Sequence, residues 1–198
     1  MKNIFKIVTL SGGDRIEIKS FNREDKKELI SFLSEQNLYE RVFFWMHIEP
    51  EEIFEEFERL LEKGNNIIVA FNKGRVAGIG FSKKYDEFYL RHMERYYLCI
   101  DKGFWGSGLV KEILAELVYL SLEDGKERVV VELLPEMKEH RREIELLEFE
   151  QIAILPEFFM DNNGVRRDIL LFANNLGNLW KGFEEGMDLE FKPRPMED

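Results

Sequence analysis

The stretch of sequence that decides the fold lies near the middle of the chain. Residues 98–110 read Leu-Cys-Ile-Asp-Lys-Gly-Phe-Trp-Gly-Ser-Gly-Leu-Val. The apolar residues before Asp101 indicate the end of a strand, and residues 106–122 carry apolar side chains at helical spacing. The first turn of a helix has unpaired N–H groups and a partial positive charge, and glycines let a phosphate approach the backbone. The stretch therefore predicts a strand, a loop and a helix. The loop either binds an anion or only turns the chain tightly.

Several familiar phosphate and nucleophile motifs are absent from this stretch. No segment has the P-loop pattern, and Gly106-Ser107-Gly108 lacks the third glycine of the dinucleotide-binding fingerprint. Gly78-Ile79-Gly80 lacks it as well. Ser107 has Trp105 and Leu109 where a nucleophile elbow requires glycines.

The pattern around this stretch alternates between strands and helices and predicts one mixed α/β sheet. Expected strands are 15–21, 67–71, 76–81, one within 88–100, 129–133, 151–160 and 169–172; expected helices are 23–34, 50–64, 106–122 and 137–147. A strand-helix-strand unit in the middle implies a parallel pair with a right-handed crossover, while the hairpins around it imply antiparallel neighbours. We expect a mostly antiparallel sheet with a central parallel β-α-β unit and helices on both faces.

The expected organisation is one domain with two appendages. Residues 1–13 are assigned to an N-terminal extension, 14–174 to the domain and 175–198 to a C-terminal tail with a short helix around Trp180. Asn22 is placed as a helix N-cap, and Gly64 and Gly125 as glycines that end helices.

Composition excludes some classes of function. The 198 residues include 28 Lys and Arg against 39 Asp and Glu, a net charge of −11, without a basic stripe. A nucleic-acid or membrane partner is therefore not expected. The only cysteine, Cys99, allows no internal disulfide, and no apolar run could span a membrane or serve as a signal peptide, so we expect a cytoplasmic protein. The three histidines form no metal-binding pattern, so no metal is expected.

The segment from Ile100 to Leu109 resembles motif A of the GNAT superfamily of N-acetyltransferases, whose signature is Arg/Gln-x-x-Gly-x-Gly/Ala. Gly108 takes the first signature glycine, whereas Trp105 and Val110 depart from the pattern at its first and last positions. Residues 146–170 resemble motif B of the same family, with Glu148 in place of its usual glycine. The order of elements over residues 14–174 is also the order of the family.

The resemblance implies a GNAT-like acyl-CoA N-acyltransferase fold and acetyl-CoA as cosubstrate. Its pantetheine arm would pair with the backbone of Leu98, Cys99 and Ile100, in the gap between this strand and the strand of Val130. Its pyrophosphate would lie on the N–H groups of Trp105, Gly106, Ser107, Gly108, Leu109 and Val110.

Acetyl transfer to an amine requires a base, and Glu94 is the candidate. It precedes Ile100 by six residues, so both side chains share one face of the strand, and some family members carry a basic Glu there. The alternative is that Glu94 is one more acid on a solvated face. The Tyr that many members use as the general acid is replaced by Ile144, and His140 is interpreted as a solvated residue.

Aromatic residues are the candidates for binding the acyl acceptor, because the family builds this site from the segment between its first two helices and the last hairpin. Here these are Phe44, Trp45 and Phe159, which could equally be core residues. The acidity of the chain favours a cationic acceptor, either a small-molecule amine or a protein amine. A homodimer is left open.

The resulting hypothesis is a CoA-dependent N-acetyltransferase that moves an acetyl group to a primary amine by direct attack. One alternative is a non-catalytic CoA-binding or regulatory module of the same fold. Another is an interaction protein whose glycines are purely structural.

Overall fold

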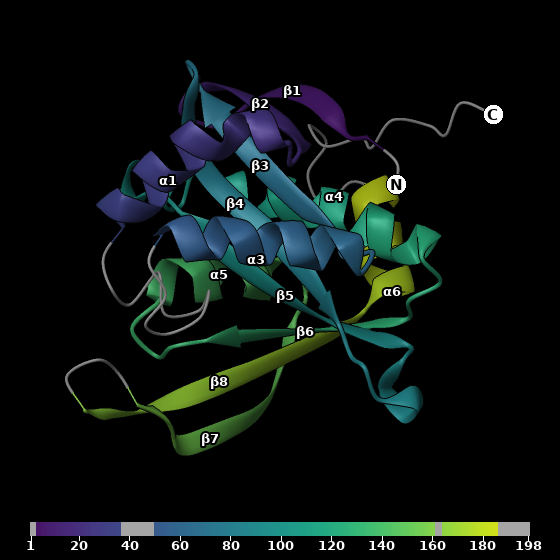
Figure 1. Cartoon of the computed structure of the whole chain (residues 1–198). Helices are drawn as coiled ribbons and strands as arrows, with labels where there is room; N and C mark the ends of the chain where they lie inside the picture. The colour runs from purple at the N-terminus through teal and green to yellow at the C-terminus, as the bar shows by residue number, and fades with distance from the viewer. Residues whose placement is uncertain (1–2, 37–49, 161–163, 186–198) are drawn as a thin grey trace.

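The computed structural model describes residues 3–36, 50–160 and 164–185, and Figure 1 shows a mixed sheet with helices on both faces. The strands lie in the order β1-β2-β3-β4-β5-β6-β8-β7. They are β1 (Phe5–Thr9), β2 (Arg15–Ser20), β3 (Ile67–Asn72), β4 (Arg75–Lys84), β5 (Met93–Ile100), β6 (Arg128–Leu133), β7 (Glu150–Met160) and β8 (Arg166–Asn175). All neighbouring strands are antiparallel except β5 and β6. The predicted sheet with its central parallel unit is confirmed.

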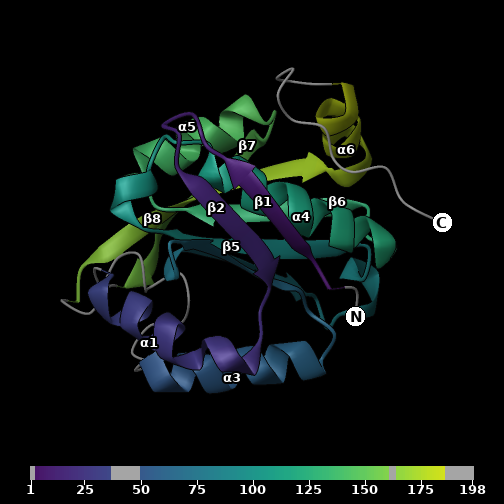
Figure 2. The same cartoon turned by 90° about the horizontal axis from the view of Figure 1, so that it is seen from above.

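The helices cover the two faces of the sheet, and each face buries an apolar core. They are α1 (Lys26–Glu35), α3 (Pro50–Glu62), α4 (Leu109–Glu123), α5 (Lys138–Leu146) and α6 (Leu176–Glu185). Figure 2 shows α1 and α3 on one side and α4, α5 and α6 on the other. Ile100, Ile113 and Val131 belong to the core on the α4 side, whereas Phe57 and Cys99 belong to the core beneath α1 and α3. Successive residues of β5 therefore face different cores.

Several local signals act as the sequence predicts. The Asn22 side chain accepts a hydrogen bond from the Glu24 amide, and the Asp25 carboxylate accepts one from the Asn22 amide, which completes a capping box before α1. Gly64 and Gly125 follow α3 and α4 with φ of +75° and +69°, a conformation that glycine adopts without steric cost. These residues set where the helices begin and end.

Two elements differ from the expectation. Strand β1 lies within the segment expected to be an extension; its residues are all exposed or half-buried, so it carries only a weak apolar pattern. Helix α4 begins at Leu109 rather than Gly106, because Gly106 and Gly108 take positive φ in the preceding turn. Strand β5 begins at Met93, after a short 3₁₀ turn over Phe88–Leu90, and lies within 88–100 as predicted. The helix predicted around Trp180 is α6.

The glycines of Gly78-Ile79-Gly80 are explained by packing. A Cβ at Gly80 would clash with Ile113 Cγ2 of α4, and one at Gly78 would lie 2.7 Å from Ile100 Cδ1. Helix α4 therefore approaches β4 closely, and this approach holds the N-terminus of α4 beside the end of β5.

Candidate functional site

Strands β5 and β6 diverge toward their carboxyl ends. Their parallel pairing runs from Met93 and Arg128 to Tyr96 and Val131, whereas β5 continues to Ile100 and β6 to Leu133. The last residues of β5 therefore lie outside the β5–β6 ladder. This is the gap that the resemblance in the sequence led us to expect between these two strands.

The backbone of Leu98 and Ile100 faces this gap. The Asp101 amide donates to the Ala77 carbonyl at 2.9 Å, and alternate residues of an antiparallel strand turn their polar groups to the same side. Cys99, which pairs with Ile79, therefore turns its N–H and C=O toward β4, and Leu98 and Ile100 turn theirs toward β6. Two of the three predicted backbone partners of a pantetheine arm thus point into the gap, and the third points away.

The loop that follows β5 is held in shape by its own side chains. Asp101 Oδ1 accepts a 2.8 Å hydrogen bond from the Gly103 amide, and Ser107 Oγ donates one of 2.6 Å to the Phe104 carbonyl. The Trp105 indole donates to the Ile100 carbonyl at 3.1 Å, which anchors the loop to the end of the strand. The site is therefore a formed loop between strand and helix.

The loop binds an anion supplied by the chain itself. The Gly106 amide donates a 2.9 Å hydrogen bond to Glu143 Oε1 on α5, and the Val110 amide is a second backbone donor to this carboxylate. Glu143 is 9% exposed, and burial raises its pKa to about 7 although these two amides favour the charged form. The sequence analysis did not identify Glu143 as a site residue.

Not every predicted loop amide is directed at this anion. The Trp105 and Ser107 amides donate to the carbonyls of Lys102 and Phe104, inside the turn. The Leu109 amide makes a long 3.4 Å contact with Ser107 Oγ. Among these groups, Gly106 and Val110 are the amides that converge on a carboxylate, so the anion position lies between them.

Helix α5 presents a second buried polar side chain to the loop. His140 is 2% exposed, its ring packs edge-to-face with Trp105 at 5.6 Å, and burial lowers its pKa to about 4. The prediction of a solvated His140 is therefore wrong. His140 and Glu143 are three residues apart and share one helix face, a spacing that could have revealed them.

Glu94, the predicted base, lies beneath α4. It is 0% exposed, its Oε2 accepts a 2.7 Å hydrogen bond from Ser121 Oγ of α4, and that hydroxyl accepts one from Tyr96. Burial raises the pKa of Glu94. Glu94 does share a strand face with Ile100 as predicted, but that face is covered by α4, so the carboxyl has no contact with solvent.

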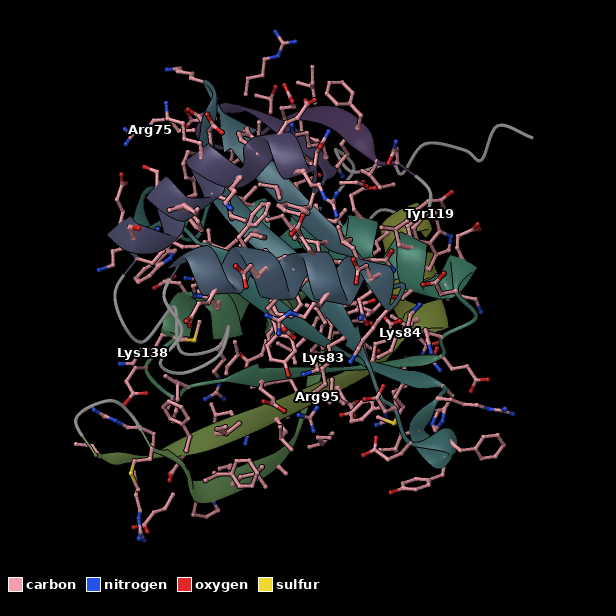
Figure 3. The ribbon with its side chains drawn as sticks, viewed as in Figure 1. Arg75, Lys83, Lys84, Arg95, Tyr119 and Lys138 are labelled. Carbon is pink, nitrogen blue, oxygen red and sulfur yellow. The ribbon has the colours of Figure 1, made fainter. Side chains whose placement is uncertain are left out.

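Polar and aromatic side chains gather on the opposite face of the sheet, where β5 and β6 part. Arg95 Nη1 lies 3.2 Å from Glu132 Oε1, and Arg95 Nε donates a 2.7 Å hydrogen bond to Tyr85. Tyr97 also hydrogen bonds with Arg95, and burial together with the charge of Glu132 raises its pKa. Figure 3 shows Arg95 beside Lys83, its cross-strand partner, on the α3 side of the sheet. Tyr97 and Glu132 are the first residues beyond the last β5–β6 pair.

Of the three residues predicted to bind the acyl acceptor, the structure describes one. Phe44 and Trp45 lie outside the described residues. Phe159 is half-buried on β7, opposite Arg167 of β8. Within residues 3–36, 50–160 and 164–185, no cluster of His, Cys, Asp or Glu could hold a metal ion, and no helix there is long and apolar enough to cross a membrane.

Comparison with known sequences identifies a family. A sequence profile described as the acetyltransferase (GNAT) family matches residues 28–148, which include the diverging strands, the glycine loop and Glu143. No curated protein sequence matches the chain.

Solved structures share the fold at low sequence identity. An N-acetyltransferase from Staphylococcus aureus Mu50 is 14% identical with a TM-score of 0.70, covering 81% of this chain and 98% of its own. A putative acetyltransferase, yncA, from Salmonella typhimurium with its cofactor acetyl-CoA is 16% identical with a TM-score of 0.67, covering 81% and 94%. A ribosomal-protein-alanine N-acetyltransferase from Brucella melitensis is 16% identical with a TM-score of 0.66, covering 80% and 98%.

Proposed function

Because the chain belongs to the acetyltransferase (GNAT) family, we propose that it transfers an acetyl group from acetyl-CoA to a primary amine. The observation that carries the proposal is the divergence of β5 and β6 directly before a glycine loop whose amides bind an anion. A similar structure that contains acetyl-CoA supports the choice of donor.

The residues around the loop fit this donor. A Cβ at Gly108 would meet no atom within 4 Å, so there is space beside the loop, and the Gly106 and Val110 amides already select a negative group. The N–H and C=O of Leu98 and the N–H of Ile100 are oriented to hydrogen bond with an amide-containing arm in the gap, whereas the Ile100 carbonyl already accepts from the Trp105 indole. When bound, acetyl-CoA supplies an activated acetyl thioester.

The acid–base groups are proposed to lie on the α3 side of the sheet rather than beneath α4. Glu132 is a half-buried carboxylate at the point of divergence and can take a proton from the ammonium group of the acceptor, directly or through a water, so that the free amine attacks the thioester. Tyr97 stays protonated because its pKa is raised, and it can donate a proton to the leaving sulfur. Arg95 holds both side chains in place. This arrangement replaces the helical Tyr for which the chain has Ile144.

The acceptor is proposed to be a cation before it reacts. The support is the net charge of −11 of the whole chain, because Glu132 itself is paired with Arg95. A negatively charged protein raises the local concentration of a protonated amine. Small amines, amino acids and the amines of proteins all satisfy this requirement.

A non-catalytic CoA-binding module is the second candidate. Two observations favour it: Glu143 occupies the anion position of the loop, and Ile144 stands where many relatives carry their Tyr. Such a module would bind acetyl-CoA without releasing its thiol.

Calorimetry with acetyl-CoA, followed by a thiol-release assay over a panel of amines, tests the proposal. We expect saturable binding and amine-dependent release of thiol. Binding without release for any amine would favour the module. No binding at millimolar acetyl-CoA would contradict both functions.

Three matched substitutions test the acid–base assignment. We expect Glu132→Gln to lower kcat by about 10²-fold or more, because a positioned base typically contributes roughly 10²–10⁴. Tyr97→Phe should lower kcat less, and Glu94→Gln should keep the rate. All three should bind acetyl-CoA like the wild type. A Glu94→Gln protein that loses activity while Glu132→Gln retains it would return the role of base to Glu94.

A further inference from the structure

The anion position of the glycine loop already has an occupant. Glu143 extends from α5 to the loop, and its Oε1 accepts the Gly106 amide at 2.9 Å while the Val110 amide also donates to the carboxylate. These two amides lie at the N-terminal end of α4, where the helix carries a partial positive charge. The carboxylate therefore takes the interactions that a phosphate would otherwise receive.

The Glu143 carboxylate makes fewer hydrogen bonds than a buried carboxylate normally does. Glu143 Oε2 is buried and has no hydrogen-bond partner among the described residues. The nearby charge of Glu139 on the same helix also opposes ionisation of Glu143, and its pKa is raised to about 7, mainly by burial. His140, the other titratable group of this helix face, is neutral at pH 7 and supplies no positive charge. A buried carboxylate with an unpaired oxygen is costly to maintain.

The loop also has room for an exchange of anions. Beside Gly108 nothing lies within 4 Å of a Cβ position, so a group approaching from that side meets no side chain. A diphosphate offers more acceptor oxygens than one carboxylate and can remain partly in solvent. Charge-assisted hydrogen bonds from backbone amides to such a group are strong.

We propose that Glu143 is an internal competitor for the anion position, and that a phosphate-bearing acyl donor binds by displacing its carboxylate from the amides of Gly106 and Val110. The identity of the donor rests on the proposed function, whereas the competition rests on the loop alone. No covalent bond changes: two N–H groups exchange one acceptor for another, and the Glu143 carboxylate returns to water.

The competition has a consequence for donor specificity. The cost of displacing Glu143 is incurred only by ligands that place a negative group on the loop. A donor that has the pantetheine arm but no phosphate, such as S-acetylpantetheine, does not incur it. Glu143 therefore lowers the affinity for the phosphate part of the donor without changing the affinity for its arm.

Calorimetry on three proteins tests this proposal: wild type, Glu143→Gln and Glu145→Gln. Glu145 is the matched control, because it is an exposed glutamate of the same helix and its removal changes the net charge equally. The probes are acetyl-CoA, inorganic pyrophosphate and S-acetylpantetheine. At pH 8, above the pKa of Glu143, we expect Glu143→Gln to bind acetyl-CoA and pyrophosphate about tenfold more tightly, since a charged competitor has become neutral. Binding of S-acetylpantetheine should be equal in all three.

The outcomes separate this proposal from the proposed function. Equal or weaker binding of pyrophosphate by folded Glu143→Gln would overturn the competition, while thiol release by the wild type would leave the enzyme intact. Tighter pyrophosphate binding without any binding of acetyl-CoA would support the competition and contradict the function. An equal gain in affinity in Glu145→Gln would show that the effect comes from the net charge alone, and would overturn the role of Glu143.

NMR spectroscopy of the wild-type protein tests the same proposal without any substitution. On addition of pyrophosphate, we expect the Glu143 carboxyl carbon-13 resonance to move to the value of a solvated carboxylate, and the Gly106 and Val110 amide resonances to shift. Shifted amides with an unchanged Glu143 resonance would show that pyrophosphate binds elsewhere and would overturn the proposal.

Discussion

A buried glutamate lies near each end of helix α4, and the two have much in common. Glu143 binds the amides at the N-terminal end, whereas Glu94 binds Ser121 in the last turns of the helix. Both are buried, both have one carboxyl oxygen without a partner in the described part of the chain, and burial raises the pKa of both.

The difference lies in the donors and in access. At the N-terminal end the donors are backbone amides beside an open space at Gly108, and the helix favours a negative charge there. Near the C-terminal end the donor is a core hydroxyl that itself accepts a bond from Tyr96, and the helix terminus disfavours a negative charge. Burial and a raised pKa therefore do not distinguish a site from a structural carboxyl. The exchangeable donors and the open space do.

The largest expected effect comes from placing a new carboxylate at each end of α4. Gly108→Glu should weaken acetyl-CoA binding by about a hundredfold or more, because like charges meet on the anion position. Gly125→Glu is the matched control: it also has positive φ and nothing within 4 Å of its Cβ position, but it lies at the other end of the helix. Both variants carry a similar cost in backbone strain. Equal loss of binding in both, measured by calorimetry on folded protein, would remove the distinction between the two ends.

The pH dependence of stability measures the cost of Glu143. Its pKa is raised from 4.5 to about 7 on folding, so the folded state holds this proton more tightly than the unfolded state. The contribution of Glu143 to the free energy of unfolding is fully present below about pH 4.5. It is lost as the pH rises through about 7, by roughly 3 kcal/mol. Glu143→Gln should therefore gain stability relative to the wild type between pH 5 and pH 8 in urea unfolding. Glu145→Gln should show no such gain, and a flat difference for Glu143→Gln would mean that its pKa is not raised.

The smallest expected effect concerns the serine hydroxyls near the two ends of α4. Ser121→Ala removes the donor to Glu94 and the acceptor of Tyr96, so the free energy of unfolding should fall by about 2 kcal/mol. Ser107→Ala removes the half-buried hydrogen bond to the Phe104 carbonyl and the long contact from the Leu109 amide, and should cost about 1 kcal/mol or less. Denaturant titration of both variants checks whether Ser121→Ala loses more stability than Ser107→Ala. A larger loss for Ser107→Ala would indicate that the loop, not the core under α4, depends on its hydroxyl.

Much of the fold was predictable because its signals are local. The apolar spacing of α4, the Asn22 cap and the glycines after α3 and α4 act within a few residues of the chain. The glycine loop was predictable for the same reason, since Gly106 and Gly108 need no distant partner to take positive φ. Strand β1 was missed because its order comes from pairing with β2 rather than from an apolar pattern of its own.

The sequence alone determined the alternation of elements, the position of the anion-binding loop and the family resemblance, because each depends on neighbouring residues. Only the tertiary structure decided what each side chain meets. Periodicity places Glu94 and Ile100 on one face of β5, but the packing of α4 decides that this face is closed. Likewise, Glu143 is distant in sequence from Gly106, and only the approach of α5 to the loop places its carboxylate on the amides. Contacts between distant segments depend on the global arrangement of the chain, which no local pattern contains.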